Sequence, residues 1–593
     1  MNMEDLIARA VRDCLRSLYP DQEAPDSLQI QPTRKEFEGE LTLVVFPLVK
    51  AYKQKPEQLG EGIGKALVQA GGLVESFNVV KGFLNLKLKS SLWCSFLAAA
   101  VQDESFGLSR NTDKGLVVVE YSSPNTNKPL HLGHLRNNFL GYAVSEILKA
   151  CGHDVRKVQI INDRGIHICK SMLAWQRYGN GESPESSGMK GDHLVGKYYV
   201  IFDKVYKEQV AKLMGQGLSE EQAADEAEIM QAARSMLKDW EEGKAEVVEL
   251  WKKMNSWVYE GFDATYERMG VDFDKLYYES ETWLLGKQVV LDGMEKGVFY
   301  KREDQSVWAD LSDEGMDEKL LLRKDGTAVY MTQDLGTAVQ RQRDFPAVRK
   351  MVYTVGNEQE YHFKVLFALL GRMGYSWASD CHHLSYGMVE LPQGKMKSRE
   401  GTVVDADELM EGMAESARRI TEELGKLDQL GESEREELYE MIGMAALKYF
   451  LLKVDPRKGM LFNPEESIDF NGHTGPFIQY GYARTCALFR KYAAPVSKVA
   501  LPASPGPAER RLLLKLYLFP KTLQESAEAY NPAILANYIY ELVKDFNSFY
   551  QQVPILQCDE ELVRDFRMQL TALSSQVVKN GMRILGMDVP ERM

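Results

Sequence analysis

The chain has 593 residues, of which 44% are hydrophobic and 27% are charged, and its formal net charge is -14 at pH 7. This length is several times that of a typical domain and the composition is that of globular proteins, so we expect several folded domains and exclude a disordered or fibrous chain. The negative charge argues against a protein that coats nucleic acid by bulk electrostatics, although it is compatible with a local basic face.

Three features bear on where the protein is expected to be located: membrane-spanning segments, a signal peptide and the spacing of the cysteines. No window of about 20 residues is apolar enough to span a bilayer, and the N-terminal segment has the pattern of an acid-containing amphipathic helix rather than of a signal peptide. The 7 cysteines are far apart and form no C-x-x-C pair, so neither a zinc ribbon nor a disulfide framework is indicated. We therefore expect a cytoplasmic protein without membrane attachment.

Residues 1–107 are predicted to form a small α+β domain. Residues 41–48, 77–80 and 83–88 have the pattern of short strands, and residues 56–69 have a helical pattern.

The second domain, residues 108–462, is predicted to be α/β with a parallel sheet. Leu116–Tyr121 is an almost unbroken apolar run, which is typical of parallel strands buried on both faces. A polar loop follows, then a helix over about residues 134–149 and a second strand at residues 155–161. This order is a βαβ unit.

The rest of the chain alternates between insertion, sheet and helix. Residues 180–266 are charged and helical and are predicted to be an insertion, after which strands are expected at residues 328–331, 350–355 and 384–389. The pattern then becomes helical almost to the end, so residues 463–593 are predicted to form an all-α domain.

The strongest chemical signal is His131-Leu132-Gly133-His134, at the turn between the first strand of the sheet and its helix. An α/β sheet presents backbone amides and a helix N-terminus to phosphate at this position. Glycine permits close approach, and two imidazoles can donate hydrogen bonds to oxygens that gain charge in a phosphoryl transition state. Taken alone, the tetrapeptide is also explained by chance spacing or by a fragmentary metal site.

The longer string SSPNTNKPLHLGHLR, residues 122–136, closely resembles the signature of arginyl-tRNA synthetases, which are class I aminoacyl-tRNA synthetases. The resemblance implies a Rossmann-like catalytic domain that activates L-arginine with ATP to arginyl-adenylate and passes the arginyl group to tRNA(Arg). It also covers both ends of the chain. Residues 46–50 and 82–86 resemble the family's N-terminal domain that touches the tRNA elbow, and residues 471–484 and 589–593 resemble its helical anticodon-binding domain.

A second, lysine-rich loop resembles the class I K-M-S-K-S loop with one departure. Lys395 and Met396 match, but Ser398 stands where the second lysine belongs and Lys397 is one residue out of register. In the arginyl family that second lysine is often absent, and a lysine just before the first motif is thought to replace it, which here is Lys128. Without this resemblance the loop is equally well explained as a solvated turn.

The resemblance implies roles for individual residues. The catalytic residues are expected to be Lys128, His131, His134 and Lys395. The ATP-binding residues are expected to be Pro124, Asn125, His131, Gly133, His134, His362, Gly387, Met388, Val389, Lys395, Met396, Lys397 and Ser398. The arginine-binding residues are expected to be Glu120, Ser123, Asn125, Tyr330, Asp334 and Gln359, with Glu358 as a competitor for Gln359.

The substrate pocket and the absence of a protein-held metal can each be weighed on physical grounds. Tyr330 and Asp334 lie in the family's Y-x-T-x-D pattern and could converge on the substrate side chain if a helix begins near Thr332, although a helix dipole alone also explains an early aspartate. His382 and His383 lie beside Cys381, but neighbours on a strand point to opposite faces and do not chelate together easily. We therefore expect no metal held by the protein, and Mg²⁺ only in company with ATP.

Three alternatives are retained at this stage: a class I synthetase for another amino acid, a nucleotidylyltransferase with the same H-x-G-H turn, and a catalytically silent tRNA-binding paralogue. The long helical C-terminal region disfavours the second, and the presence of both histidines and of Tyr330 and Asp334 disfavours the third. A monomer is expected.

Overall fold

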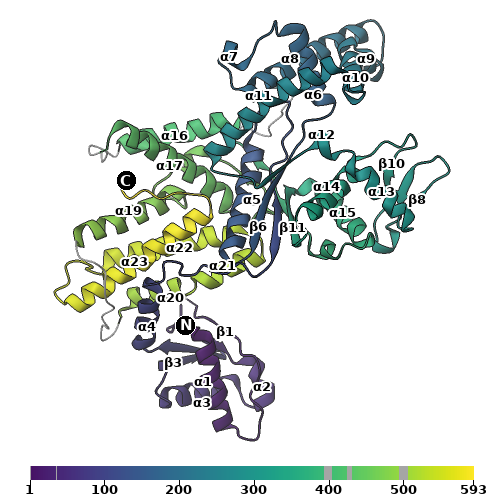
Figure 1. The fold of residues 1–593 in the computed structure, drawn as a ribbon. Coiled ribbons are helices and arrows are strands. Elements are labelled where there is room, and N and C mark those ends of the chain that lie inside the picture. The colour runs from purple at the N-terminus through teal and green to yellow at the C-terminus, as the bar shows by residue number, and fades with distance from the viewer. Residues whose placement is uncertain (1, 35, 393–403, 424–429, 493–504) are drawn as a thin grey trace.

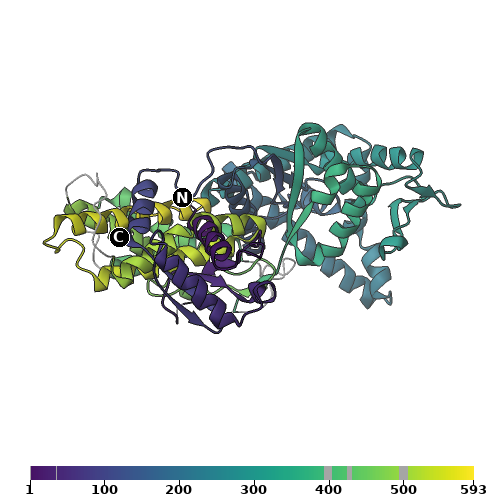
Figure 2. The same cartoon turned by 90° about the horizontal axis from the view of Figure 1, so that it is seen from below.

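The computed structural model describes residues 2–34, 36–392, 404–423, 430–492 and 505–593 (Figure 1). An open parallel sheet lies at the centre, a helical lobe projects from one end of it, and a helical bundle packs beside it with the N-terminal domain below. Seen from below, the N-terminal domain lies in front of the bundle (Figure 2). Within the described ranges, no helix has both the length and the apolarity needed to cross a membrane.

The N-terminal domain is α+β, as predicted. Its antiparallel sheet has the strand order β1-β2-β4-β3. The strands are β1 (Ile30–Pro32), β2 (Leu41–Val44), β3 (Val74–Val80) and β4 (Phe83–Leu88), and the helices are α1 (Met3–Leu18), α2 (Phe46–Tyr52), α3 (Pro56–Gln69) and α4 (Ser90–Val101). The strand predicted at residues 41–48 is too long, because α2 begins at Phe46 with Pro47 in its first turn, where a missing N–H costs nothing.

The central sheet contains five parallel strands in the order β12-β11-β5-β6-β7. They are β5 (Leu116–Glu120), β6 (Asp154–Ile161), β7 (Lys275–Tyr278), β11 (Val348–Gly356) and β12 (His382–Tyr386). All five residues of β5 are buried, which explains the unbroken apolar run. Val117 and Val119 pack into the core shared with the helical bundle, while Leu116 and Val118 pack into a second core on the other face. The predicted βαβ unit is confirmed, with α5 (Leu132–Ala150) as its helix.

Two predicted strands are wrong in detail. Residues 328–331 do not form a strand, because α14 (Tyr330–Asp344) begins there and Ala328 makes only an isolated bridge to Leu322. The strand predicted at residues 384–389 is divided: β12 ends at Tyr386, and β13 (Val389–Glu390) pairs instead with β14 (Met460–Leu461). The division occurs because Gly387 N–H donates to the carbonyl of Pro456, outside the sheet, at 2.9 Å.

The remaining elements of the catalytic domain surround this sheet. The predicted insertion is helical and forms the upper lobe of Figure 1. It comprises α6 (Ile166–Tyr178), α7 (Pro184–Ser187), α8 (Gly191–Gly215), α9 (Glu220–Glu226), α10 (Glu228–Glu241) and α11 (Ala245–Met269). On the side of the central sheet away from the helical bundle lie α12 (Glu279–Thr282), α13 (Leu285–Glu295), α15 (Glu360–Arg372) and a small antiparallel sheet of β8 (Tyr300–Lys301), β9 (Val307–Ala309) and β10 (Lys319–Leu322).

The C-terminal part is helical, as predicted, apart from the short strand β14. Its helices are α16 (Ala406–Glu423), α17 (Glu432–Leu452), α18 (Pro464–Ser467), α19 (Gly475–Tyr492), α20 (Pro507–Tyr517), α21 (Phe519–Glu528), α22 (Pro532–Gln552) and α23 (Glu561–Ile584). The buried residues of this bundle are continuous with those of α5 and of the N-terminal domain.

A buried arginine joins the N-terminal domain to the helical bundle. Arg510 of α20 donates from Nη1 to Glu40 Oε1 at 3.0 Å and from Nη2 to Glu75 Oε2 at 2.9 Å. It also donates to the carbonyl of Leu88 and to the hydroxyl of Ser90, each at 2.9 Å. The guanidinium thus holds β4 and the start of α4 against α20.

We expect Arg510→Ala to destabilise this junction by about 3–5 kcal/mol, because Glu40 is buried and loses its countercharge. Thermal unfolding and limited proteolysis between the two domains would measure the effect. Its neighbour Arg511 is exposed, and Arg511→Ala is the matched control. Equal stability of the two variants would contradict the assignment.

Candidate active site

The candidate site lies at the carboxyl ends of the parallel strands, where open α/β sheets bind ligands. The loop after β5 is attached to the end of β6: Thr126 N–H donates to the carbonyl of Asn162 at 3.1 Å, and Asn162 N–H donates to that of Pro124 at 2.9 Å. In this loop Pro124 is buried, whereas Ser123 and Asn125 are exposed. The last two are therefore available to a substrate.

The loop turns sharply at Ser122, whose φ of 63° is uncommon for a residue other than glycine. Its N–H donates to Asn137 Oδ1 at 2.6 Å, and its hydroxyl lies 2.7 Å from the hydroxyl of Tyr266. Helices α5 and α11 therefore hold the residue in this conformation. Backbone strain of this kind is common at binding sites.

The two histidines of the first motif are fixed by backbone donors. Gly133 N–H donates to His131 Nδ1 at 3.2 Å, and His131 N–H donates to His134 Nδ1 at 3.1 Å. Burial lowers the pKa of His131 to about 4 and the pKa of His134 well below its usual value. Both rings are therefore neutral at pH 7, and because each Nδ1 accepts a hydrogen bond, each ring carries its proton on Nε2. The pair offers two N–H donors without a metal.

Lys128 lies beside these rings at a cavity of about 240 Å³ between the motif and helix α8. Burial lowers its pKa, and among the described residues no carboxylate forms an ion pair with it. A poorly solvated ammonium group without a countercharge favours an anionic ligand. The cavity is lined by Lys128, Pro129, Leu130, His131, Met189, His193, Gly196, Lys197, Tyr199, Val200 and Asp405.

The second motif itself, with Lys395, Met396, Lys397 and Ser398, lies outside the described residues. Its C-terminal flank is described, and it meets the first motif. Leu132 N–H donates to the carbonyl of Val404 at 3.4 Å, and Ala406 N–H donates to that of Leu130 at 3.0 Å. The structure thus brings one end of the second motif to the first.

Gly387, Met388 and Val389, the predicted adenine-binding stretch, follow β12. The buried Arg136 donates to the carbonyl of Gly387 at 2.6 Å and to that of Lys458 at 2.9 Å, which fixes this backbone against α5. A Cβ at Gly387 would lie 2.5 Å from the nitrogen of Gly459, so a side chain cannot be accommodated there without displacing the neighbouring backbone. The side chain of Met388 is 55% exposed.

The predicted arginine-binding residues are only partly assembled. Asp334 Oδ2 lies 2.6 Å from His362 Nε2, so the structure places His362, predicted for the nucleotide side, next to the arginine side. Tyr330 is the first residue of α14 and is 79% exposed, and the described residues include no contact between its ring and Asp334.

Glu120 is buried at the end of β5 and forms an ion pair with Arg341 of α14. Gln359 lies in the turn after β11.

Glu279 is a site residue that the sequence did not reveal. It directly follows β7. Burial raises the pKa of its carboxyl group to about 7; the positive charge of Arg164 lowers this pKa, and the negative charges of Asp163 and Asp334 raise it further. The charge of Asp334 thus links Glu279 electrostatically to the predicted arginine pocket. Strand β7 is only four residues long and lies at the edge of the sheet, so no periodicity in the sequence marks it.

Other candidate positions are occupied by structural contacts. The ring of His382 stacks on Tyr530 with centroids 4.3 Å apart, and His383 lies 4.5 Å from the ring of Phe363.

Among the described residues, one group, Asp192, His193 and Asp407, has metal-ligand spacing. Lys190 Nζ lies 2.6 Å from Asp407 Oδ2 and 3.3 Å from Asp192 Oδ2, so an internal ammonium group already offsets part of the negative charge of this group.

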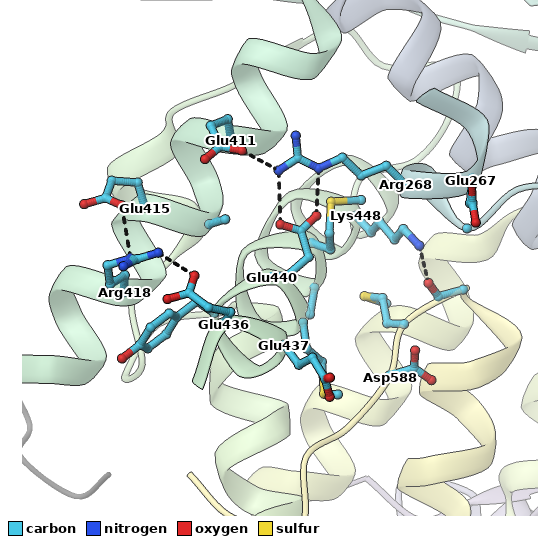
Figure 3. Close-up of a pocket in the computed structure, with 18 residues that line it drawn as sticks. Glu267, Arg268, Glu411, Glu415, Arg418, Glu436, Glu437, Glu440, Lys448 and Asp588 are labelled. Carbon is cyan, nitrogen blue, oxygen red and sulfur yellow. Dashed lines mark hydrogen bonds and ion pairs between the residues drawn. The ribbon is translucent and has the colours of Figure 1, made fainter. Parts of the chain in front are cut away.

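A larger cavity, of about 690 Å³, lies between the end of α11, helices α16 and α17, and the C-terminal segment (Figure 3). It contains none of the motif residues. Arg268 forms ion pairs with Glu411 and Glu440, each at 2.9 Å, and Arg418 pairs with Glu415 and Glu436. The ion pairs of Arg268 join the insertion to the helical bundle, and those of Arg418 lie within the bundle. The residues that could carry the chemistry lie elsewhere.

The parallel sheet, the H-x-G-H turn after its first strand and the appended helical bundle define a class I aminoacyl-tRNA synthetase. The model for the catalytic domain of class I (R) tRNA synthetases matches residues 97–463, the DALR anticodon binding domain matches residues 478–593, and the arginyl tRNA synthetase N-terminal domain matches residues 2–88. The chain belongs to the arginyl-tRNA synthetase family.

Relatives over the whole length agree with this. The chain is 53% identical to the arginine–tRNA ligase of Flavobacterium psychrophilum and 54% identical to that of Bacteroides thetaiotaomicron, with 100% of both chains covered in each case. The Thermus thermophilus arginyl-tRNA synthetase has the same fold, with a TM-score of 0.79, 24% identity, and 99% and 100% of the two chains covered. The predicted family, fold class and enzymatic function, ligation of arginine to tRNA with ATP, are confirmed.

The buried histidines predict a pH dependence of stability. The folded-state pKa of His131 is about 4, so the unfolded chain binds protons below about pH 6.5 that the folded chain does not. The free energy of unfolding should therefore fall by about 1–2 kcal/mol from this residue between pH 7 and pH 5.

Chemical denaturation at both pH values would test this, with His131→Asn expected to reduce the fall. The exposed His167 provides the control variant His167→Asn. If the free energy of unfolding falls between pH 7 and pH 5 by the same amount in both variants and in the unsubstituted protein, His131 is not held neutral.

Proposed function

We propose that the site handles phosphate and arginine with two separate sets of residues. Lys128, His131 and His134 lie on the phosphate side, and Lys395 is assigned to the same side from its motif. The carboxylates Glu120, Asp334 and Glu279 lie on the arginine side. The contrast between unpaired cationic or neutral donors and clustered carboxylates carries this proposal.

In the first step the carboxylate of arginine attacks the α-phosphorus of ATP, and pyrophosphate leaves. Little covalent chemistry falls to the protein, so positioning and electrostatic stabilisation dominate. The Nε2–H groups of His131 and His134 donate to the phosphoryl oxygens as their charge grows. Lys128 neutralises the departing pyrophosphate. In the second step the arginyl group passes to the terminal ribose of tRNA(Arg).

ATP is proposed to enter as its Mg²⁺ complex. The described residues around the phosphate side include imidazoles and ammonium groups, and the described lining of the cavity beside Lys128 contributes one carboxylate, that of Asp405. Mg²⁺ prefers oxygen ligands and keeps much of its coordination from water and phosphate. This set therefore fits a metal carried by the nucleotide better than a metal held in a protein cage.

The arginine side chain is proposed to bind between Asp334 and Glu279. A guanidinium is planar and always charged, and carboxylates in fork geometry recognise it best. A low-dielectric pocket that excludes water strengthens the pairing and makes an uncharged substitute costly. Glu120, Ser123, Asn125 and Gln359 are left to hold the amino-acid backbone end, and Tyr330 covers the pocket once a substrate is bound.

Two surfaces are proposed for tRNA. In the N-terminal domain, a cavity of about 270 Å³ is proposed to take a splayed base of the tRNA elbow. It is lined by Gln31, Arg34, Glu36, Phe37, Thr42, Val80, Lys81, Phe83 and Asn85. In the C-terminal bundle, Arg484 lies 5.0 Å from the rings of both Tyr480 and Tyr550, a cationic and aromatic surface suited to the anticodon loop. By contrast, Tyr482 is only 6% exposed and belongs to the core.

The domain limits 1–107, 108–462 and 463–593 remain proposals. A monomer in the cytoplasm is also proposed, because one chain carries the arginine, ATP and tRNA surfaces and its cysteines lack the spacing of a disulfide framework.

We expect Lys128→Ala to slow adenylate formation by about 100- to 1000-fold, because it removes a charge that acts on phosphate. ATP–pyrophosphate exchange in the presence of tRNA would measure this, and tRNA binding should be nearly unchanged. Lys197 lines the same cavity but is paired with Glu182 at 2.8 Å, so Lys197→Ala is the matched control and should have a small effect. Equal effects would remove Lys128 from the mechanism.

Asp334→Asn and Glu279→Gln should each weaken the use of arginine by about 2–5 kcal/mol, because each removes a countercharge of the buried guanidinium. The preference for arginine over citrulline, its neutral near-isostere, should shrink in both variants. Steady-state kcat and KM with tRNA present would measure this, with exposed Glu281→Gln as the control. Unchanged arginine parameters in either variant would exclude that residue from the pocket.

A further inference from the structure

Arg341 lies directly behind the arginine pocket. It is 2% exposed, and its Nη1 forms an ion pair with Oε2 of Glu120 at the end of β5. Its guanidinium carbon lies 5.3 Å from the ring centroid of Tyr277 and 5.5 Å from that of Tyr353. Strands β7 and β11 therefore supply two aromatic neighbours of the guanidinium, and β5 supplies its carboxylate.

Helix α14 places Arg341 and Asp334 on the same face. They are seven residues apart, close to two helical turns, so their side chains project in the same direction at different depths. Asp334 lies toward the substrate with His362, whereas Arg341 lies beneath Glu120. Helix α14 thus carries Asp334, a proposed substrate ligand, and also Arg341, the ion-pair partner of a second proposed ligand, Glu120.

Arg341 itself cannot easily reach a substrate. Its guanidinium is buried among aromatic rings, whereas Glu120 retains 8% of its surface and follows directly into the substrate-binding loop. The ion pair joins Nη1 of Arg341 to Oε2 of Glu120. A carboxylate held through one oxygen by an immobile guanidinium presents the other in a fixed direction.

We propose that Arg341 is a positioning residue that orients Glu120 toward the arginine substrate and does not itself touch it. The inference rests on the proposed function only in taking Glu120 as an arginine ligand. It assigns Arg341 a role in the KM for arginine, with no role in binding ATP or in handling phosphate.

Four variants test this: Glu120→Gln, Arg341→Met, the double variant, and Arg343→Met as a control at an exposed position on the same helix. Aminoacylation with saturating tRNA gives the KM for arginine and for ATP separately. We expect Glu120→Gln and Arg341→Met each to raise the KM for arginine by about 10- to 100-fold, with the KM for ATP changed less than about twofold. Arg343→Met should leave both constants unchanged.

The double variant separates positioning from folding. Arg341→Met alone leaves a buried carboxylate without a countercharge, which destabilises the protein, whereas the neutral double variant should recover thermal stability. If Arg341 acts through Glu120, the KM for arginine in the double variant should equal that of Glu120→Gln, because residues acting as one unit are not additive. This comparison remains decisive even if Arg341→Met does not fold.

The unfavourable outcomes are distinct. An unchanged KM for arginine in Glu120→Gln would show that the proposed role of Glu120 is wrong. A raised KM in Glu120→Gln with an unchanged KM in Arg341→Met would overturn the inference alone. A double variant much worse than Glu120→Gln, or an equal rise in the KM for ATP, would also overturn it, since Arg341 would then act independently of Glu120.

Discussion

The side-chain amide of Asn137, in helix α5, ties together the carboxyl ends of three neighbouring strands. Its Oδ1 accepts from Ser122 N–H at the end of β5, and its Nδ2 donates to the carbonyl of Thr354 in β11 at 2.7 Å and to the hydroxyl of Tyr386 in β12 at 3.1 Å. A buried amide with this many partners has little freedom to rotate. Asn137 of the helix that the loop precedes, together with Tyr266 of α11, therefore holds the left-handed turn at Ser122 and with it the direction of the loop to His131.

Burial has opposite electrostatic effects on the two sides of this loop. On the side proposed for phosphate, burial keeps His131 and His134 neutral and lowers the pKa of Lys128, and no carboxylate in the described part of the chain forms an ion pair with this lysine, which favours an anion. On the side proposed for arginine, burial raises the pKa of Glu120 and Glu279, which favours a cationic partner. The buried groups proposed for phosphate thus favour a negatively charged ligand, and those proposed for arginine favour a positively charged one.

The end of helix α11 connects this site with the helical bundle. Tyr266 contacts Ser122 and Gln159 beside the substrate loop, while Arg268, two residues later, forms ion pairs with α16 and α17 at the cavity of Figure 3. Residues two apart on a helix point to different sides, so one turn of helix touches both regions. The last turns of α11 therefore contact both the substrate loop and the helical bundle.

Local pattern was sufficient for β5, for helix α5 and the histidine turn, for the helical insertion and for the C-terminal bundle. In each of these a run of residues has its own period, or a motif lies within a single turn. The strand expected at residues 328–331 was wrong because α14 begins at Tyr330, where the hydroxyl of Thr332 accepts from Val329 N–H. The undivided strand at residues 384–389 was wrong because the bond from Gly387 to Pro456 involves a residue far along the chain.

By itself, then, the sequence determined the family, the parallel sheet and the position of the histidine turn that is proposed to handle phosphate. Only the tertiary structure decided that Glu279 approaches Asp334, that His362 pairs with Asp334, and that Arg341 lies beneath Glu120. These interactions join α12, α14, α15 and β5, which are far apart along the chain. A charge on a short edge strand or inside a helix has no local signal of its partner, because packing between elements sets that distance.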